Sequence, residues 1–399
     1  MGKLSVRDLL AGAPRGQKIL VRVDYNVPQD DLGKITDDTR MRETIPTLRL
    51  MLDHGATPIL MSHLGRPKGK PDAKYSLKPV AERLHELFPQ VHVALAADVG
   101  GTASRQAVAD SSAGSLVLLE NLRFDAGEEK NDAALAKNLA ALGAAYVNDA
   151  FGASHRRHAS VVAVAELHRG RAAMGLLMQK ELDAYERILA HPAAPFIAVL
   201  GGAKVSDKLG VVNHLIDRCQ TIVIGGAMAY TFLKADGIGV GKSLVEEELV
   251  PAARDALARA RDKAVEIALP TDHVIARAFD DAASAKDCAL EIPEGWLALD
   301  IGPRTRERYV AAIKRAKTIA WNGPMGVFEN ERFAAGTHAV AKAIVESGAK
   351  SYAGGGDTVA AITRWQLEKG ITHISTGGGA SLELMEGKTL PGVAALTSK

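Results

Sequence analysis

Short apolar runs rich in Val, Ile and Leu alternate with longer amphipathic stretches along nearly the whole chain. Such runs are typical of buried strands, and strands that alternate with helical patterns are typical of parallel α/β sheets. The first set of runs lies at residues 18–26, 57–63, 92–98, 115–121 and 144–149. Helical patterns separate the runs, as at residues 40–54, 77–88 and 133–142. The pattern therefore predicts an α/β fold.

A second set of apolar runs follows the stretch HPAAP at residues 191–195. Its members lie at residues 196–202, 221–226, 265–270, 297–302, 318–323, 351–356 and 373–378. A chain of 399 residues is long for one core. We therefore predict two parallel-sheet α/β domains of the same class, at residues 1–173 and 191–386, joined by a rigid amphipathic helix at residues 174–190.

Composition narrows the class of protein. Hydrophobic residues make up 47% and charged residues 24% of the chain, as in globular proteins with a large core. The net charge of +2 gives no indication of the basic surface of a nucleic-acid binder. The two cysteines have no paired spacing, and no stretch resembles a signal peptide or a membrane span. We expect a cytoplasmic protein with no nucleic-acid or membrane partner.

Polar side chains follow the strands of the first set. In open parallel sheets, ligands bind at the carboxyl edge of the strands. Arginine forks match carboxylate and phosphate oxygens, so several at one edge indicate a small anion with more than one charge, although a single arginine is more often solvated or paired with an acid. The candidates are Asp24, Asn26, Arg40, His63, Arg66, Arg123, His155 and Arg156.

The strands of the second set end in glycine instead. Glycine-rich loops let backbone N–H groups cradle phosphates, and Lys204 and Lys208 lie in the first of these loops. Together the loops indicate a site for a nucleoside polyphosphate. They are GGAKVSDK from Gly201, IGGAMA from Ile224, WNGPMGVFE from Trp321, GGGDT from Gly354 and STGGG from Ser375.

Two of these loops have an alternative interpretation. Gly377, Gly378 and Gly379 lie between a strand-like run at 373–376 and a short helix predicted at 380–386, where free N–H groups favour a phosphate. The alternative is a tight turn without a ligand. Asp357 opens another helical run, where its carboxylate is a candidate magnesium ligand or, alternatively, a helix N-cap.

An anion site on one domain and a nucleotide site on the other indicate transfer of a phosphoryl group between them. No motif of a covalent nucleophile is found in the chain, so direct in-line transfer is the simpler hypothesis. Transfer needs positive charge and N–H groups around the moving group, for which Lys204, Arg40 and residues 377–379 are candidates. Because the sites lie on different domains, we expect a hinge closure that expels water.

The sequence resembles the phosphoglycerate kinases. The resemblance rests on RVDYNVP, MSHLGRP, LLENLRF, YVNDAFGASHR, LGGAKVSDK, WNGPMGVFE, GGGDT and STGGGASLELMEGKTLPGV, which follow the family's order over essentially the full chain. It implies reversible magnesium-dependent transfer of the 1-phosphate of 1,3-bisphosphoglycerate to ADP, giving 3-phosphoglycerate and ATP, in glycolysis. It also implies a monomer of two doubly wound, Rossmann-like parallel-sheet domains joined by a helix, whose C-terminal tail, from about residue 387 to residue 399, folds back onto the first domain.

The resemblance also implies roles for residues that match the family's motifs. Those implied to hold the phosphoglycerate are Asp24, Asn26, Arg40, His63, Leu64, Gly65, Arg66, Arg123, His155 and Arg156. Those implied to bind the nucleotide are Gly202, Ala203, Lys204, Lys208, Gly226, Leu244, Asn322, Pro324, Glu329, Gly355, Gly356, Asp357 and Thr358. Arg40 would also stabilise the charge on the moving phosphoryl group, and Asp357 would meet Mg²⁺.

Two other functions remain open at this point. One is another acyl-phosphate kinase, such as one acting on acetate, although the number of arginines favours a substrate with two charged ends. The other is a nucleotide-dependent binding or scaffold protein without activity, against which the presence of Lys204, Arg40 and Asp357 argues.

Overall fold

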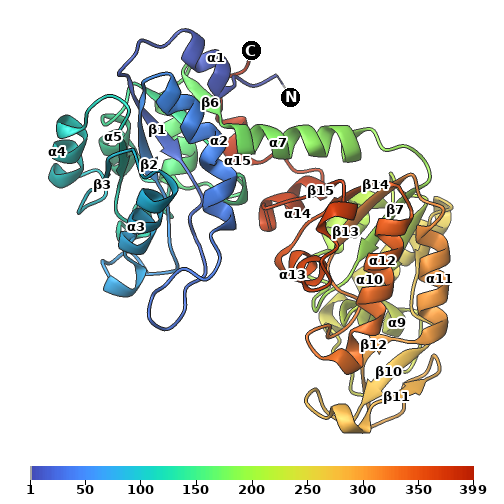
Figure 1. Cartoon of the computed structure of the whole chain (residues 1–399). Coiled ribbons are helices and arrows are strands. Elements are labelled where there is room, and N and C mark those ends of the chain that lie inside the picture. Colours follow the sequence, from blue (N-terminus) through green and yellow to red (C-terminus); the bar gives the residue numbers. More distant parts are fainter. Residues whose placement is uncertain (1) are drawn as a thin grey trace. The chain divides into compact units, whose positions relative to one another are not determined.

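The structure is a computed structural model that describes residues 2–399. The chain forms two compact units (Figure 1). Unit 1 runs up to Asp183 and includes Thr389–Lys399, and unit 2 is Ala184–Lys388. The predicted return of the tail to the first domain is therefore confirmed.

Unit 1 is built on a six-stranded sheet in the order β3-β4-β2-β1-β5-β6, in which every pair of neighbours is parallel. The strands are β1 (Lys18–Arg22), β2 (Thr57–Met61), β3 (Val93–Leu95), β4 (Leu116–Leu118), β5 (Ala145–Asn148) and β6 (Ala172–Met174). Five of them lie within predicted runs. The sequence pattern does not predict β6, because its residues Ala-Ala-Met are few and carry no branched side chain.

Helices cover the unit 1 sheet. They are α1 (Val6–Ala11), α2 (Thr39–Asp53), α3 (Lys78–Leu87), α4 (Thr102–Asp110), α5 (Ala133–Ala140), α6 (Val164–Leu167) and α15 (Pro391–Ala394), whereas α7 (Leu176–Tyr185) begins in unit 1 and ends in unit 2. The three helical patterns predicted in this half correspond to α2, α3 and α5. The predicted joining helix begins at Leu176 rather than at residue 174, because Met174 belongs to β6, and it ends in a π-helical segment, Glu186–Ala190.

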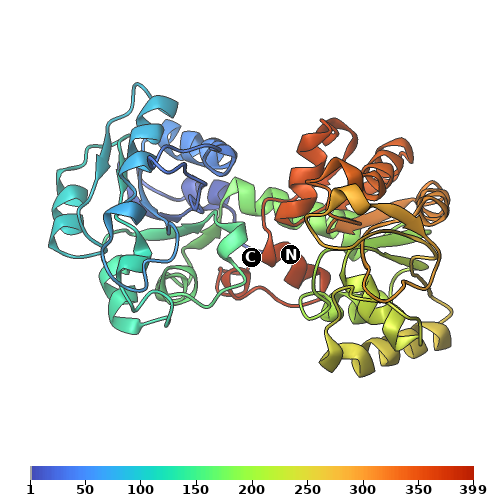
Figure 2. The ribbon, with the colours of Figure 1, turned by 90° about the horizontal axis from the view of Figure 1, so that it is seen from below.

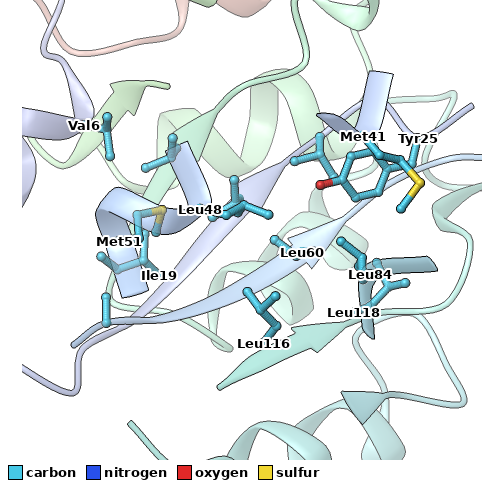
Figure 3. Packing of buried hydrophobic residues seen from close by; sticks show 14 of the residues in the cluster. Val6, Ile19, Tyr25, Met41, Leu48, Met51, Leu60, Leu84, Leu116 and Leu118 are labelled. Atoms are coloured by element: carbon cyan, nitrogen blue, oxygen red, sulfur yellow. The ribbon is translucent and has the colours of Figure 1, made fainter. Parts of the chain in front are cut away.

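The core of unit 1 lies between one face of this sheet and helices α1 to α3 (Figure 3). Alternate strand residues point to this face, as expected for a pleated sheet. The strand side chains Ile19 and Leu60 join Leu48 and Met51 of α2 and Leu84 of α3 in one buried cluster. This packing fixes β1 and β2, whose carboxyl ends carry candidate site residues.

Unit 2 contains a second six-stranded parallel sheet, in the order β15-β14-β13-β7-β8-β9. Its strands are β7 (Phe196–Leu200), β8 (Thr221–Ile224), β9 (Glu266–Ala268), β13 (Thr318–Asn322), β14 (Lys350–Ala353) and β15 (His373–Ile374). Its helices are α8 (Leu209–Leu215), α9 (Met228–Ala235), α10 (Val250–Asp262), α11 (Pro303–Ile313), α12 (Ala335–Glu346), α13 (Gly356–Arg364) and α14 (Gly379–Met385). Nowhere in residues 2–399 does a helix have the length and apolarity needed to cross a membrane.

One predicted strand belongs to a different sheet. The run at residues 297–302 forms β12 (Leu297–Ile301), which pairs antiparallel with β10 (His273–Ala276) in a three-stranded sheet that β11 (Lys286–Cys288) completes. Its apolar run has the character of a buried parallel strand, and such a run does not specify its partner. The small sheet packs against Tyr230 and Leu233 of α9.

The tail and the start of the chain lie side by side in unit 1, as the labels N and C in Figure 2 show. Lys3 and Ser398 form an antiparallel bridge, and the N–H of Leu4 donates to the carbonyl of Thr397 at 2.8 Å. Further along the tail, the N–H of Gly392 donates to the carbonyl of Ser154 at 2.8 Å. The tail thus contacts the segment that carries His155.

Candidate active site

The residues predicted to hold the anion follow four adjacent strands of unit 1, β4, β2, β1 and β5. Because these strands are parallel, their carboxyl ends meet at one edge of the sheet. Asp24 and Asn26 follow β1, the segment His63 to Arg66 follows β2, Arg123 follows β4, and His155 and Arg156 follow β5. Arg40 lies in the first turn of α2.

Asp24 and Arg40 form an ion pair at this edge. Arg40 Nη1 donates to Asp24 Oδ2 at 2.5 Å, and the N–H of Asn26 donates to Asp24 Oδ1 at 3.2 Å. Burial acts to raise the pKa of Asp24, but His63, Arg40 and Arg22 outweigh it and lower the pKa to about 2. Asp24 is therefore ionised at neutral pH and holds the Arg40 guanidinium beside the edge.

His63 is buried and contacts Arg22, a residue that sequence reasoning did not select. Arg22 Nη2 lies 3.1 Å from His63 Nδ1, whereas Asp24 Oδ1 lies 4.0 Å from the same atom. Burial holds the pKa of His63 well below its ordinary value, and Arg22, Arg123 and Arg156 lower it further against the effect of Asp24. The ring is therefore neutral at neutral pH.

The loop after β2 is fixed from both sides. The N–H of Gly65 donates to Asn26 Oδ1 at 2.8 Å, and Arg123 Nη1 donates to the carbonyl of Gly65 at 2.6 Å. Leu64 is buried and exchanges hydrogen bonds with the side chain of Asn121. Two hydrogen bonds thus join Asn26, Gly65 and Arg123 at this edge.

His155 and Arg156 complete the edge. Arg156 Nε donates to His155 Nε2 at 3.3 Å, and burial, followed by the charge of Arg156, lowers the pKa of His155. Arg66 is exposed, and its guanidinium forms no hydrogen bond or ion pair within the described residues 2–399. The predicted residues of unit 1 therefore gather at one edge, with Arg66 at its exposed side.

The glycine loops of unit 2 also meet at one edge, where they follow β7, β8, β13, β14 and β15. Three of these loops bind one another through the backbone. The N–H of Gly202 donates to the carbonyl of Pro324 at 3.0 Å, and that of Gly226 donates to the carbonyl of Met325 at 2.9 Å. Gly226 has a φ of 65°, and a Cβ there would lie 2.5 Å from the nitrogen of Gly202. Only glycine permits this close approach.

The two lysines of the first loop have different surroundings. Lys208 Nζ donates to the carbonyls of Gly201 and Asn322, at the ends of β7 and β13, and burial lowers its pKa to about 8. Lys204 and its neighbour Ala203 are exposed, and the Lys204 ammonium forms no hydrogen bond in the described part of the chain. The ammonium of Lys208 thus lies between the ends of two strands, while that of Lys204 is accessible to a ligand.

Asn322 and Thr358 link the ends of neighbouring strands. Asn322 Nδ2 donates to the carbonyl of Gly354 at 2.9 Å, and Thr358 Oγ1 accepts from the N–H of Gly323 at 2.7 Å. Gly355 lies between these contacts as the N-cap of α13, with a φ of 96°, and Gly356 begins the helix. These bonds set the position of the start of α13 relative to β13.

Leu244 and Glu329 are exposed and lie on loops. The loop of Leu244 is tied to the lysine loop, because Ser206 donates to Glu246 from its N–H at 3.0 Å and from its Oγ at 2.6 Å. Leu244 and Glu329 each remain a predicted member of the nucleoside pocket.

The glycines that precede α14 are only partly free. Gly377 is buried, and its N–H donates to Ser375 Oγ at 3.1 Å. Gly378 is the N-cap with a φ of 49°, and the helix begins at Gly379, one residue before the predicted start. The N–H groups of Gly378 and Gly379 have no acceptor within residues 2–399. An anion at this turn would therefore meet two of the three predicted donors.

Comparisons with known proteins agree with this architecture. The sequence model described as "Phosphoglycerate kinase" matches residues 9–388. The chain belongs to the phosphoglycerate kinase family. It is 52% identical to the phosphoglycerate kinase of Chloroflexus aurantiacus, with 99% of each chain covered, and 51% identical to that of Koribacter versatilis, with both chains fully covered.

Solved structures give the same result. The phosphoglycerate kinase of Coxiella burnetii matches with a TM-score of 0.88 and 37% identity, and that of Pyrococcus horikoshii OT3 with 0.84 and 34%; each match covers 98% of both chains. The chain is thus a kinase of the phosphoglycerate kinase family, with a carboxyl group as phosphoryl acceptor. This finding decides against a kinase of another acyl phosphate, such as one acting on acetate.

Phosphoglycerate kinases use ATP or ADP with Mg²⁺, and the surroundings of Asp357 fit that ion. Asp357 lies in the first turn of α13, but the N-cap is Gly355 and no side chain caps the helix, so the capping alternative is wrong. The Asp357 carboxylate is exposed and forms no hydrogen bond within residues 2–399. Magnesium usually takes one or two protein carboxylates and completes its shell with phosphates and water.

Sequence reasoning missed residues that support these two candidate edges. Arg22, Glu128 and Ser160 are completely buried, and Glu246 anchors the lysine loop. A signal for Arg22 was present, because a charge within the apolar run at residues 18–26 needs a partner inside the protein. Nothing comparable indicates Ser160, whose partners lie far away in the sequence.

Proposed function

We propose that unit 1 binds 3-phosphoglycerate or 1,3-bisphosphoglycerate and that unit 2 binds ADP or ATP. The observation that carries the proposal is the separation of two kinds of edge. An edge of arginine, histidine and asparagine side chains suits a small anion with two charged ends, and a glycine edge with lysines suits a chain of phosphates.

The roles proposed for individual residues follow from charge and accessibility. Arg40, already held by Asp24, and the exposed Lys204 neutralise the charge that develops on the moving phosphoryl group. The N–H groups of Gly378 and Gly379, with Gly377 beside them, donate hydrogen bonds to the oxygens of the moving phosphoryl group. Lys208 and Thr358 bind the nucleotide phosphates, and Gly226, Leu244, Asn322, Pro324 and Glu329 line the nucleoside pocket.

Asp357 would hold the Mg²⁺ that accompanies the nucleotide. When bound, the ion supplies positive charge to the phosphate oxygens. The chain's own contribution is the exposed Asp357 carboxylate, whose main chain is fixed in the first turn of α13.

The reaction also requires the two sites to meet. We propose direct in-line transfer after a closure of the phosphoglycerate-binding domain, residues 1–173 with about 387–399, toward the nucleotide-binding domain, residues 191–386, through the joining segment at 174–190, whose helix begins at Leu176. Closure expels water that would otherwise hydrolyse the acyl phosphate. We further propose that the protein acts as a monomer in the cytoplasm, with no nucleic-acid or membrane partner.

The test is formation of ATP from ADP and 1,3-bisphosphoglycerate in a coupled assay. Lys204→Ala should lower turnover by roughly 10²- to 10³-fold, the loss typical of one group that stabilises transition-state charge, and should change the KM for ADP little. Lys369→Ala, which removes another exposed lysine of unit 2, is the matched control.

Two results would contradict the proposal. Turnover of Lys204→Ala equal to that of the wild type would remove Lys204 from the reaction. No ATP formation by the wild-type protein, despite nucleotide binding, would favour the inactive scaffold instead.

A further inference from the structure

A buried chain of hydrogen bonds leads from Glu128 to His63. Glu128 Oε1 accepts from Ser160 Oγ at 2.6 Å, and Ser160 Oγ accepts from Arg22 Nε at 2.8 Å. Arg22 Nη2 then lies 3.1 Å from His63 Nδ1. Arg22, Ser160 and Glu128 are 0% exposed, and His63 is 7% exposed. These hydrogen-bonded side chains therefore lie below the edge that the substrate would contact.

The remaining polar side-chain atoms of Arg22 and Glu128 are also hydrogen-bonded. The third nitrogen of Arg22, Nη1, donates to the carbonyl of Val23, and the second oxygen of Glu128 accepts from the N–H of Ser160 at 3.0 Å. Burial acts to raise the pKa of Glu128, but His158, Arg22 and Ser160 outweigh it and lower the pKa. A buried guanidinium and a buried carboxylate thus compensate each other through one hydroxyl.

This geometry determines which ring nitrogen of His63 carries the proton. A guanidinium has donors only, so Nδ1 must accept from Arg22 and carries no proton. The proton of the imidazole is then on Nε2. Asp24 does not compete for Nδ1, because its Oδ1 lies 4.0 Å away, beyond hydrogen-bond distance, and its other oxygen is bound by Arg40.

We propose that Arg22, anchored by Ser160 and Glu128, is a positioning residue that holds His63 as the Nε2–H tautomer, and that this N–H donates a hydrogen bond to an oxygen of the anionic substrate. The second half of the proposal rests on the proposed function, and the first half does not. A neutral donor suits this edge because Arg123 and Arg156 already surround the ring with positive charge.

The tautomer is measured by two-dimensional NMR of the ring nitrogens in protein labelled with ¹⁵N. The chain has 12 histidines, so the signal of His63 is identified by its absence in His63→Gln. The wild type at neutral pH should show His63 protonated at Nε2. In Arg22→Met, which keeps an unbranched apolar stem but removes the guanidinium donors, the signal should shift toward the Nδ1–H tautomer or the protonated ring.

Two further variants make the measurement specific. Arg157→Met makes the same chemical change at an exposed arginine of unit 1 and should leave the His63 signal unchanged. Because Arg22→Met leaves Glu128 without its cation, Arg22→Met/Glu128→Gln removes both charges and should show the same tautomer change if the single variant does not fold. A wild-type His63 protonated at Nδ1, or an unchanged signal in the folded Arg22 variants, would overturn the proposal.

Calorimetry with 3-phosphoglycerate tests the second half. The folded Arg22 variant should bind it roughly tenfold more weakly, the loss expected for one hydrogen bond to a charged group, and should bind ADP as the wild type does. A changed tautomer with unchanged affinity would overturn the donor role of Nε2. If wild type failed to bind 3-phosphoglycerate at all, the proposed function would fail, and the tautomer result would still decide the role of Arg22.

Discussion

The pKa values of buried carboxyl groups in this protein shift in opposite directions, depending on the groups around them. Asp24 lies among cationic side chains, and its pKa falls to about 2 although burial opposes the shift. Asp149 and Asp300 accept hydrogen bonds from backbone N–H groups, and burial raises the pKa of each to about 7. Asp149 Oδ1 accepts from Leu177 at 2.9 Å, and Asp300 Oδ2 accepts from Gly336 at 2.7 Å.

The raised pKa of Asp300 predicts a pH dependence of stability in unit 2. An unfolded aspartate titrates near pH ~4, so between about 4 and about 7 the folded state binds more protons than the unfolded state. The contribution of Asp300 to the free energy of unfolding should therefore be complete below pH ~4 and be lost as the pH rises to about 7, with a slope of at most about 1.4 kcal/mol per pH unit.

Asp300→Asn cannot ionise, so its stability relative to the wild type should rise across this pH range. All three tryptophans, Trp296, Trp321 and Trp365, lie in unit 2, so urea unfolding followed by tryptophan fluorescence reports this unit. Asp149→Asn makes the matched change in unit 1 and should leave the fluorescence transition unaltered. Parallel curves for wild type and Asp300→Asn would contradict the prediction.

At the scale of elements, the sequence predicted most strands because apolar runs and glycines mark where each strand lies and ends. It misplaced β12 because an apolar run does not show whether its partner is parallel or antiparallel, and it missed β6, β10 and β11 because these strands are short. Most candidate site residues were selected from their positions after predicted strand ends, and the structure places these at one edge of each six-stranded sheet. Ser160 was not found, because its role depends on contacts with Arg22 and Glu128 that only the folded chain brings together.

The glycine edge of unit 2 depends on the close approach of the loops at Gly226 and Gly202. In Gly226→Ala the new Cβ would have to move the loop after β7, because it would lie 2.5 Å from the nitrogen and 2.6 Å from the carbonyl oxygen of Gly202. The variant also retains a positive φ, so we expect unit 2 to lose roughly 1–3 kcal/mol of stability. ADP binding, measured by calorimetry, should weaken as well.

Gly239→Ala is the control for this substitution. Gly239 has no positive φ, and, apart from its neighbours in sequence, no described residue has an atom within 4 Å of the position a Cβ would take. Fluorescence-detected urea unfolding should give Gly239→Ala a midpoint near that of the wild type. Equal midpoints for Gly226→Ala and the wild type would show that the loops adjust without cost.

At the scale of the whole molecule, the last residues of the chain should stabilise only the unit to which they return. Leu396 is buried in unit 1, and the neighbouring N–H of Thr397 donates to the carbonyl of Ala172 in β6 at 2.9 Å. Leu396→Ala should destabilise unit 1 by about 2–5 kcal/mol, as expected for a buried leucine. Circular dichroism, which reports both units, should show an early transition.

Tryptophan fluorescence, which reports unit 2, should keep the wild-type midpoint in Leu396→Ala. Ser398→Ala, at an exposed position of the same tail, should change neither signal. If fluorescence and circular dichroism shifted together in Leu396→Ala, the two units would unfold as one, and the tail would act on the whole molecule.

The two proposed ligand sites lie on different units. The chain crosses between the units at Asp183–Ala184 and again at Lys388–Thr389, while each proposed ligand contacts residues of one unit only. A ligand shifts a conformational equilibrium only by its differential affinity for the two states. One ligand alone contacts the same residues in the open and closed states, so it should shift the equilibrium little. In the proposed closed state both ligands together would contact each other and residues of both units, and they should therefore favour that state.

Small-angle X-ray scattering in four states measures this effect: without ligand, with 3-phosphoglycerate, with magnesium and ADP, and with all of them. The radius of gyration should decrease only in the last state. Lys204→Ala should compact as the wild type does if Lys204 acts on the transition state rather than on closure, which separates the chemical step from the conformational one. Equal dimensions in all four states would mean that transfer occurs without a closing hinge, and the water-exclusion argument would then fail with it.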